Sequence, residues 1–311
     1  MTQAPCFYTL GNVTVDDLVF SDGRTRMGIP GGNGVYSTLG LRVWGAHVAI
    51  VSICGPDYPL AALVELGVSL SHMKATLPAT LRNWGLYEED GTRQFVFRGL
   101  GVRWEDFSPS PADLPSSRGG HYHIAPLPLE HQLALVQDLR EVHKAQTISL
   151  DPDDRTLATI DHARLKLLLS GLDVFLPSRQ EAAALFPGLT PQGALLAIRD
   201  LCPEIPVVVV KLGRDGAIFH GRGEAEITRV PAFHGGAIDP TGAGDAFCGG
   251  FLYGYALSRD PLEAALSGTI SASFAVEGVG IDGLMAATVA EAQSRLATLR
   301  SAVGSRVLKQ L

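Results

Sequence analysis

The sequence predicts an α/β fold in which helices cover a mostly parallel central sheet. Short runs rich in β-branched and aromatic residues alternate along the chain with segments of helical period, which is typical of this class. The 311 residues contain no repeat of 20–50 residues and no low-complexity linker, so we expect one domain spanning residues 1–311. Glycine, with 35 residues, exceeds the roughly 7% that is usual, which indicates many tight turns.

Strands and helices are expected in alternation from the N-terminus to the C-terminus. Apolar, β-branched runs predict strands at residues 7–10, 48–53, 121–124, 147–150, 174–176 and 207–211. Helical periodicity predicts helices at residues 35–44, 60–66, 129–143, 157–169, 180–185, 192–201, 243–257 and 262–276. A last helix begins at Thr288, where Glu291 three residues later completes a capping box.

The segment 80–102 breaks this alternation. Two runs of alternating polar and apolar residues meet at Asp90-Gly91, and that dipeptide between such runs is a strong signal for a β-hairpin. We expect the hairpin to stand off the main body and to form a small sheet with residues 13–29. On these residues alone, an ordinary surface hairpin is an equal alternative.

Charge and cysteine content favour a cytoplasmic enzyme that acts on small molecules. The chain has 25 Lys and Arg against 32 Asp and Glu, a net charge of −7, which argues against a nucleic-acid partner and an anionic membrane surface. Its four cysteines are scattered without zinc-site spacing, so we expect reduced thiols. The first residues lack the features of a signal peptide, and no apolar run approaches 18 residues, so no membrane span is expected.

The most informative stretch is Asp-Pro-Thr-Gly-Ala-Gly-Asp-Ala-Phe at residues 239–247. Its glycines allow a sharp turn, and the following helix directs its positive end and its free N–H groups at the same point, which predicts an anion site. Asp245 would repel a bound phosphate, so its presence is best explained as a base that takes a proton from an attacking nucleophile. The structural alternative is an Asp that only caps the helix.

This string closely resembles the C-terminal signature of the ribokinase-like (PfkB) carbohydrate kinases, Asp-Thr-Thr-Gly-Ala-Gly-Asp-Ala-Phe. The resemblance implies a three-layer ribokinase-like fold with a small β lid, formed here by about residues 13–30 and 78–103. It also implies an ATP-dependent kinase that transfers the γ-phosphate to a primary hydroxyl of a sugar or sugar-like alcohol. Asp245 would be the base, and the amides of Gly242, Ala243 and Gly244 would receive the developing charge.

Two earlier segments resemble the substrate-binding residues of the same family. Gly32 falls at the glycine that packs against sugar hydroxyls, next to Asn33, in the family's N-terminal signature. Tyr36 stands where many family members have Asn, and it could donate a hydrogen bond or offer a stacking face. Asp16 matches the family's hydroxyl-binding Asp, and its two oxygens suit two adjacent hydroxyls, although Asp17 competes for this role.

The nucleotide site is also expected from the resemblance. No Gly-Lys dipeptide exists, so the chain has no Walker A loop, and the Gly-x-Gly-x-x-Gly at 278–283 follows an apparent helix rather than the strand that a dinucleotide-binding fingerprint requires. In the family, that stretch lies beside the adenine and a monovalent-cation site. A lysine that ends the strand 207–211 could approach a phosphate or could simply be solvated. The expected cofactor-binding residues are Lys211, Gly213, Gly216, Thr241 and Gly280.

The family's metal motif is Asn-x-x-Glu after a strand, and the matching residues here begin with Ser178 and end with Glu181. Glu181 would hold Mg²⁺ through water, since Mg²⁺ keeps much of its hydration shell. Ser178 in place of Asn could also cap the helix. Asp239 is a candidate ligand for a K⁺ ion. Two neighbouring histidines at 121 and 123 share a strand face, but they lack a third ligand, so core or surface roles are favoured.

Two alternative functions and the oligomeric state remain open on the sequence. A nucleoside kinase of the same family would use the same chemistry, with Tyr36, Trp84 or Tyr87 stacking on a base. A non-catalytic sugar- or nucleotide-binding relative is suggested by the departures at Ser178 and Tyr36, although the intact anion loop counts against it. The resemblance also leaves open a homodimer formed through the lids.

Overall fold

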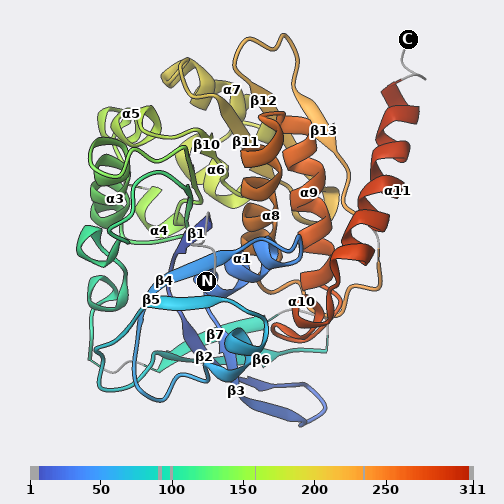
Figure 1. The fold of residues 1–311 in the computed structure, drawn as a ribbon. Coiled ribbons are helices and arrows are strands. Elements are labelled where there is room, and N and C mark those ends of the chain that lie inside the picture. The colour runs from blue at the N-terminus through green and yellow to red at the C-terminus, as the bar shows by residue number, and fades with distance from the viewer. Residues whose placement is uncertain (1–6, 90–92, 99–100, 158, 234, 308–311) are drawn as a thin grey trace.

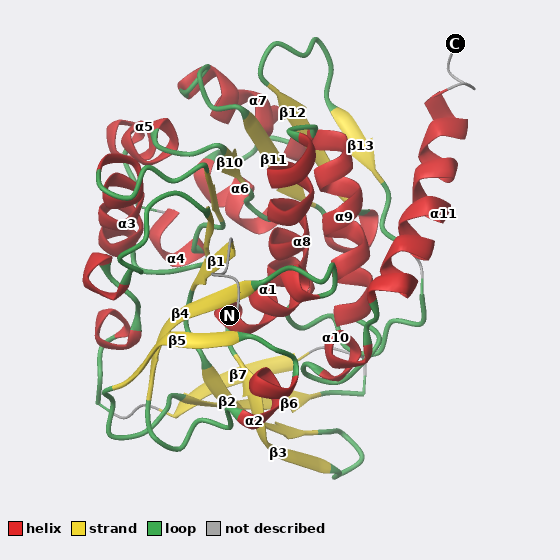
Figure 2. Ribbon diagram, in the orientation of Figure 1, coloured by secondary structure: helices red, strands yellow, loops and turns green. Residues whose placement is uncertain are grey.

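A nine-stranded sheet forms the middle layer of the molecule, with helices on both faces (Figures 1 and 2). In this computed structural model, residues 7–89, 93–98, 101–157, 159–233 and 235–307 are described. The strand order is β13-β12-β11-β10-β9-β8-β1-β4-β5. The seven strands from β11 to β5 pair in parallel, and β12 pairs antiparallel with both of its neighbours, β11 and β13. The predicted α/β class with a mostly parallel sheet is therefore confirmed.

All six predicted strands are present, and the sheet extends beyond them at both edges. The large sheet consists of β1 (Phe7–Leu10), β4 (Val48–Cys54), β5 (Ser69–Ala75), β8 (His121–Ile124), β9 (Thr147–Leu150), β10 (Val174–Phe175), β11 (Val207–Lys211), β12 (Ala217–Gly221) and β13 (Thr228–Val230). The three strands that the sequence did not predict are the edge strands β5 and β13 and the strand β12 next to β13. An edge strand such as β5 is half exposed and polar, so its hydrophobic pattern is weak.

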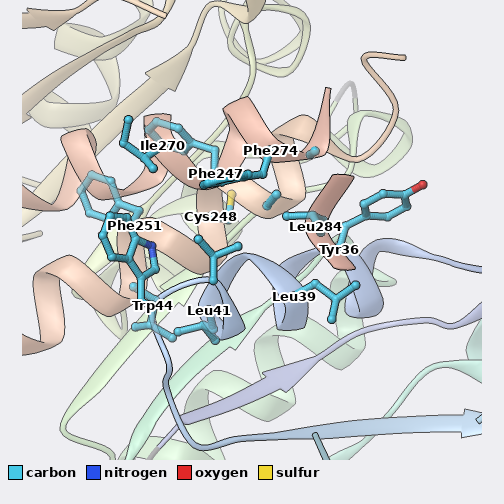
Figure 3. Packing of buried hydrophobic residues seen from close by; sticks show 14 of the residues in the cluster. Tyr36, Leu39, Leu41, Trp44, Phe247, Cys248, Phe251, Ile270, Phe274 and Leu284 are labelled. Carbon is cyan, nitrogen blue, oxygen red and sulfur yellow. The ribbon is translucent and has the colours of Figure 1, made fainter. Parts of the chain in front are cut away.

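The helices are sorted onto the two faces by their apolar residues. One face is covered by α1 (Asn33–Arg42), α8 (Ala243–Ser258), α9 (Pro261–Ala275), α10 (Asp282–Ala286) and α11 (Val289–Val307), with α2 (Ala61–Glu65) beside them. The other face is covered by α3 (Leu129–Glu141), α5 (His162–Ser170), α6 (Arg179–Leu185) and α7 (Pro191–Leu201). Each face buries its own hydrophobic core. Figure 3 shows the packing of α1 against α8 and α9 in the first of these cores.

One predicted helix is wrong in its bounds. The segment 157–169 is divided into α4 (Asp154–Leu157) and α5, which begins after Asp161. The side chain of Asp161 accepts a hydrogen bond from the backbone N–H of Arg164 and so caps the start of α5. Apolar periodicity runs across this break because it does not register a cap.

A separate four-stranded sheet lies beside the main body, below α1 and α10 in Figure 1. Its order is β3-β2-β6-β7, formed by β2 (Thr14–Val19), β3 (Thr25–Gly31), β6 (Arg82–Tyr87) and β7 (Arg93–Arg98). The two segments that the sequence assigned to a small sheet thus pair with each other, through the parallel pair β2 and β6. The Asp90-Gly91 turn lies outside the described residues. We call this sheet the lid; that it closes over a substrate stays a prediction.

Three cysteines in the described residues are buried and form no disulfide, as expected for reduced thiols; Cys6 lies outside those residues. None of the helices in the described parts of the chain combines the length and the apolar character that a membrane span needs.

Candidate active site

A cavity of about 430 Å³ opens at the carboxyl ends of the parallel strands β9, β10 and β11. This edge is where open α/β sheets bind ligands. The first turn of α8 closes the cavity from the opposite side with Gly244 and Asp245. The other lining residues are Pro126, Asp151, Ser178, Arg179, Gln180, Glu181, Lys211, Leu212 and Gly213.

The backbone of the predicted anion loop has the geometry that its glycines suggested. Gly242 is the N-cap of α8 and has a left-handed conformation, with φ 72°. A Cβ atom at this position would lie 2.1 Å from Cδ1 of Tyr36, so only glycine lets the ring pack against the loop. Ala243, Gly244 and Asp245 form the first turn, whose N–H groups have no partner within the helix. The helix dipole adds positive potential at this point, which favours an anion.

Asp245 lies in this positive region and faces the cavity with two other carboxylates. Burial raises the pKa of Asp245 to about 7; Lys211 opposes this shift, and Glu181 adds to it. Near neutral pH the group is therefore poised between its two protonation states, which is the condition for efficient proton transfer. That Asp245 acts as the base stays a prediction.

Lys211 is a buried lysine held by an ion pair. Its Nζ lies 2.5 Å from Oδ2 of Asp151 and 3.5 Å from Sγ of Cys248. Burial opposes the charge on Lys211, but Asp151 outweighs burial and raises the pKa of the ammonium. The ammonium also lies 3.6 Å from where a Cβ on Gly244 would be, directly beside the anion loop. The sequence left open whether Lys211 approaches a phosphate or is solvated. In the structure its side chain is largely buried and lies beside the anion loop.

Glu181 lines the same cavity and also caps its own helix. Oε2 of Glu181 accepts a hydrogen bond of 2.5 Å from the backbone N–H of Ser178, whose hydroxyl accepts one from the N–H of Glu181. Burial, reinforced by the charge of Asp151, raises the pKa of Glu181 to about 7. Oδ1 of Asp151 is buried and has no hydrogen-bond partner among the described residues.

These oxygens fit a hydrated Mg²⁺ ion, which is typically held through one or two carboxylates and several waters. No cluster of three or more metal-ligating side chains occurs in the described residues. The described residues therefore form no site in which side chains alone would coordinate the ion.

A second cavity of about 310 Å³ adjoins the first and shares Lys211, Gly213 and Gly244 with it. Its remaining walls are mostly apolar and come from the loop 213–216, the segment 232–243 and α9. Gly216 lines this cavity, so the predicted nucleotide loop borders both cavities. Thr241 and Gly280 lie instead around Asp239.

Asp239 is almost completely buried and accepts hydrogen bonds from three sides. Thr241 donates its N–H at 2.9 Å and its hydroxyl at 2.6 Å to Oδ1. Oδ2 accepts the hydroxyl of Tyr87 at 2.7 Å and faces the N–H of Gly280 at 3.5 Å. The loops that were predicted to flank a cation site are thus in contact through Asp239, and the lid residue Tyr87 reaches the first of them.

Asp16 and Asp17 lie on opposite faces of the lid sheet, which separates the two candidates. Asp17 forms a bidentate ion pair with Arg82, with distances of 2.7 and 3.0 Å, and therefore has a structural partner. Asp16 faces the main body and accepts hydrogen bonds on Oδ1 from Thr14 at 2.8 Å and Asn83 at 3.2 Å. Burial raises the pKa of Asp16 to about 6, and these two hydrogen bonds oppose the shift.

The residues around Gly32 join Asp16 to the anion loop. Gly32 has φ 99° and passes so close to Asn12 that a Cβ would lie 2.4 Å from its carbonyl oxygen. Asn33 uses its side chain within the protein, accepting from the N–H of Asn12 and donating to the carbonyl of Pro126, both at 2.8 Å. Tyr36 is buried on Gly242, and its hydroxyl points away from the apolar cluster in Figure 3.

Burial, and then the charges of Asp16 and Asp239, raise the pKa of Tyr36. The ring therefore lies between the lid carboxylate and the anion loop. The charge of Asp245 also raises the pKa of Tyr36, so this ring links Asp16 to Asp245. We call Asp16, Tyr36 and Asp245 the recess; that an acceptor binds among them is a prediction.

Other candidates from the sequence have structural partners. Nδ1 of His121 is hydrogen-bonded to Thr147 at 2.9 Å, and Nδ1 of His123 to Ser149 at 3.0 Å, in agreement with the core or surface roles that were favoured for them. Trp84 lies on the same lid face as Asp17, under the guanidinium of Arg98 at 5.2 Å, so it does not face the recess.

Comparison with known proteins agrees with this geometry. The sequence profile of the pfkB family carbohydrate kinases matches residues 17–285, most of the chain. The chain belongs to the pfkB family. A cytidine kinase from Thermococcus kodakarensis is 28% identical over 257 residues, which cover 82% of this chain and 89% of that protein. This pfkB protein is thus a kinase of the class that acts on sugars and nucleosides.

Solved structures show the same fold. The nucleoside kinase of Methanocaldococcus jannaschii superposes with a TM-score of 0.73 at 19% identity, over 94% of this chain and 98% of that one. A protein from Escherichia coli assigned as a ribokinase II, solved with ATP and Mg²⁺, superposes with a TM-score of 0.75 at 22% identity, over 94% and 99%. The ribokinase-like fold expected for a pfkB kinase is therefore confirmed.

Asn83, which contacts Asp16 from the lid of this pfkB kinase, escaped sequence analysis. Asp151 was visible in the sequence, because Asp-Pro-Asp-Asp-Arg at 151–155 resembles the family's Asp-Pro-Asn-x-Arg at the end of a strand. Its partner Lys211 was not predicted, because it lies 60 residues away. Asn83 gave no signal, because it lies within an alternating run where every second residue is polar.

Proposed function

We propose that this protein transfers the γ-phosphoryl group of ATP to a primary hydroxyl of a polyhydroxylated acceptor. One observation carries the proposal: Gly244 and Asp245, in the first turn of α8, line one cavity, and Tyr36 lies close enough to both Asp16 and Asp245 for their charges to raise its pKa. An acceptor whose other hydroxyls bind at Asp16 could present its terminal hydroxyl to Asp245. The anion loop would then lie beside the phosphoryl group.

The chain's own residues would act in a single in-line displacement. Asp245 takes the proton of the acceptor hydroxyl as its oxygen attacks the γ-phosphorus, and ADP leaves with the electrons of the broken bond. The amides of Gly242, Ala243 and Gly244, together with the ammonium of Lys211, stabilise the charge on the transferring group. The lid would exclude water, which competes as a nucleophile.

The resemblance and the geometry point to where the cofactors would bind. The second cavity, whose walls are mostly apolar and which adjoins the anion loop, would hold the adenosine of ATP. Glu181 and Asp151 would hold a hydrated Mg²⁺ ion, which supplies positive charge to the triphosphate. A K⁺ ion would bind at the loops around Asp239. Backbone carbonyls would be its ligands there, since the carboxylate of Asp239 already accepts several hydrogen bonds.

Within this class we favour a sugar or the ribose part of a nucleoside. A nucleoside is supported by the similarity to a cytidine kinase over most of both chains. The lid adds a second observation. Phe97 is paired directly opposite Asn83, so the two side chains share the inner lid face, and Phe97 is 58% exposed. An exposed ring on that face could stack on a nucleobase.

The test of this function replaces the base without changing its size. Asp245→Asn should leave ATP binding intact and lower kcat by about 10²–10⁴, the usual loss for a general base. Phosphoryl transfer would be measured with ATP, Mg²⁺ and a panel that includes D-ribose, D-fructose, cytidine and inosine. Turnover of the variant within about threefold of the parent would contradict the role of Asp245. Turnover of the nucleosides alone would select the nucleoside kinase.

We also propose that two chains associate through their lids. Trp84 and Val96 are paired opposite each other on the outer lid face and are 44% and 47% exposed, beside the edge strand β7. An apolar face next to an open sheet edge is suited to pairing with a second copy of the same surface.

A further inference from the structure

The lid contains a buried amide whose oxygen has no hydrogen-bond partner. Asn83 is only 8% exposed, and its Oδ1 atom has no partner among the described residues. Such orphaned acceptors are uncommon in folded proteins, and each costs free energy in the unliganded state. The unpaired oxygen of Asn83 requires an explanation, because Asn83 contacts Asp16, the residue at which the hydroxyls of the acceptor are proposed to bind.

The orientation of this amide follows from its neighbour. Asn83 and Asp16 are register partners in the parallel pair of β6 and β2, and Nδ2 of Asn83 donates to Oδ1 of Asp16 at 3.2 Å. A carboxylate can only accept, so the NH₂ group must face it, and the amide oxygen must face elsewhere. Thr14 also donates to Oδ1.

The second oxygen of Asp16 completes the arrangement. Among the described residues, Oδ2 receives no hydrogen bond, and it lies against Gly31, where a Cβ atom would approach to 2.0 Å. Asp16 Oδ2 and Asn83 Oδ1 are therefore two acceptors on adjacent strands that receive no hydrogen bond from the described residues, and the missing Cβ of Gly31 lets the carboxylate pack against its backbone. Two acceptors call for two donors.

We propose that Asn83 is a specificity-determining residue that binds, together with Asp16, two adjacent hydroxyls of a ribofuranose ring. Asp16 accepts from one hydroxyl, and Asn83 Oδ1 accepts from the neighbouring one. This inference rests on the proposed function, because it assumes that the acceptor binds in the recess. It adds that the enzyme selects ribose-type acceptors over their 2-deoxy analogues.

The reason for this selection is the acceptor that a deoxy analogue leaves unpaired. A site built to hydrogen-bond a hydroxyl discriminates strongly against an analogue that lacks it, because the buried partner loses its hydration without gaining a bond. We expect kcat/KM for cytidine to exceed that for 2′-deoxycytidine by about 10- to 100-fold, and D-ribose to exceed 2-deoxy-D-ribose similarly, where the pair is turned over.

The experiment compares the wild type with Asn83→Leu, which is close in size and lacks the acceptor. The variant should lose most of its kcat/KM for the ribo acceptor and little for the deoxy acceptor, so that their ratio falls to within about threefold of unity. The KM for ATP should not change. Gln94→Leu, the same amide-to-leucine change at an exposed position of the same hairpin, is the matched control and should keep the wild-type ratio.

Each outcome decides between the two levels of the proposal. If wild-type enzyme phosphorylates ribo and deoxy acceptors equally, this inference is wrong while the proposed function stands. If D-fructose alone of the panel is phosphorylated, this inference is wrong while the proposed function stands; if no member of the panel and neither deoxy analogue is phosphorylated, both fail. If Asn83→Leu does not fold, Asn83→Ser, which keeps a shorter acceptor, should show an intermediate ratio; an unchanged ratio in either variant overturns the role of Asn83.

Discussion

At the scale of single residues, the candidate active site has a cost in folding free energy, because it buries carboxylates. These are Asp245, Glu181, Asp151 and Asp16. Burial raises the pKa of each of these carboxylates, to about 7 for the first two and about 6 for the others. A raised pKa means that the folded protein binds the proton more tightly than the unfolded chain does. The stability from these groups is therefore fully present below about pH 4, and it falls as the pH rises through the folded-state pKa.

This relation makes Asp245→Asn a stabilising change at neutral and alkaline pH. The variant has no charge to bury, and one pKa unit corresponds to about 1.4 kcal/mol, so we expect a gain on the order of 2 kcal/mol at pH 8. The gain should shrink toward pH 4, where Asp245 is protonated in the folded protein and about half protonated in the unfolded chain. Urea unfolding of the ligand-free proteins at pH 4, 6 and 8 checks this, and a gain that does not depend on pH would contradict it.

At the scale of elements, strand β6 connects the lid to Asp16 and to the anion loop. Alternate residues face the main body: Asn83 contacts Asp16, and Tyr87 donates to Asp239 in the anion loop. A second contact joins Arg26 of β3 to Asp282 of α10 in an ion pair. The position of the lid and the geometry of the anion loop are thus coupled.

Tyr87→Phe isolates this coupling, because it removes the hydroxyl while keeping the ring that packs near Phe20. A hydrogen bond to a buried carboxylate contributes about 1.5–3 kcal/mol, so the lid should open more often in the variant. Hydrogen–deuterium exchange of the β6 amides should become about 10-fold faster or more, while α8 is unaffected. Equal exchange of β6 in both proteins would show that Tyr87 does not restrain the lid.

On the scale of the whole molecule, the chain divides into a self-contained body and an exposed lid. The body buries a separate core on each face of its sheet. The lid sheet is open at both edges, β3 and β7, and its outer face exposes Trp84 and Val96. A surface of this kind is a site of association between chains.

Trp84→Glu should therefore weaken a dimer that the wild type forms, since it places a charge in an apolar contact. Sedimentation velocity over a concentration series should show a dimer for the wild type and a monomer for the variant. Leu257→Glu is the matched control: Leu257 is 67% exposed near the end of α8, outside the lid, and its variant should stay dimeric. A monomeric wild type at every concentration would rule out association through the lids.

The fold was largely predictable because its signals are local. Buried parallel strands such as 207–211 consist of continuous β-branched residues, and the anion loop carries its glycines and its carboxylate within nine residues. Prediction failed where the pattern is weak or interrupted. The edge strands β5 and β13 and the adjacent β12 are short or partly polar, and the cap at Asp161 divides a helix that periodicity alone runs together.

By itself, the sequence determined the α/β class, the succession of strands and helices along the chain, the lid segments and the identity of Asp245 as the candidate base. Tertiary structure alone decided which of Asp16 and Asp17 faces the recess, since the side of a strand depends on its register with β6. It also decided that Lys211 is buried on Asp151 and that Asn83 joins Asp16, because these pairs are 60 and 67 residues apart. Contacts between distant segments depend on how whole elements pack, and no local pattern records that packing.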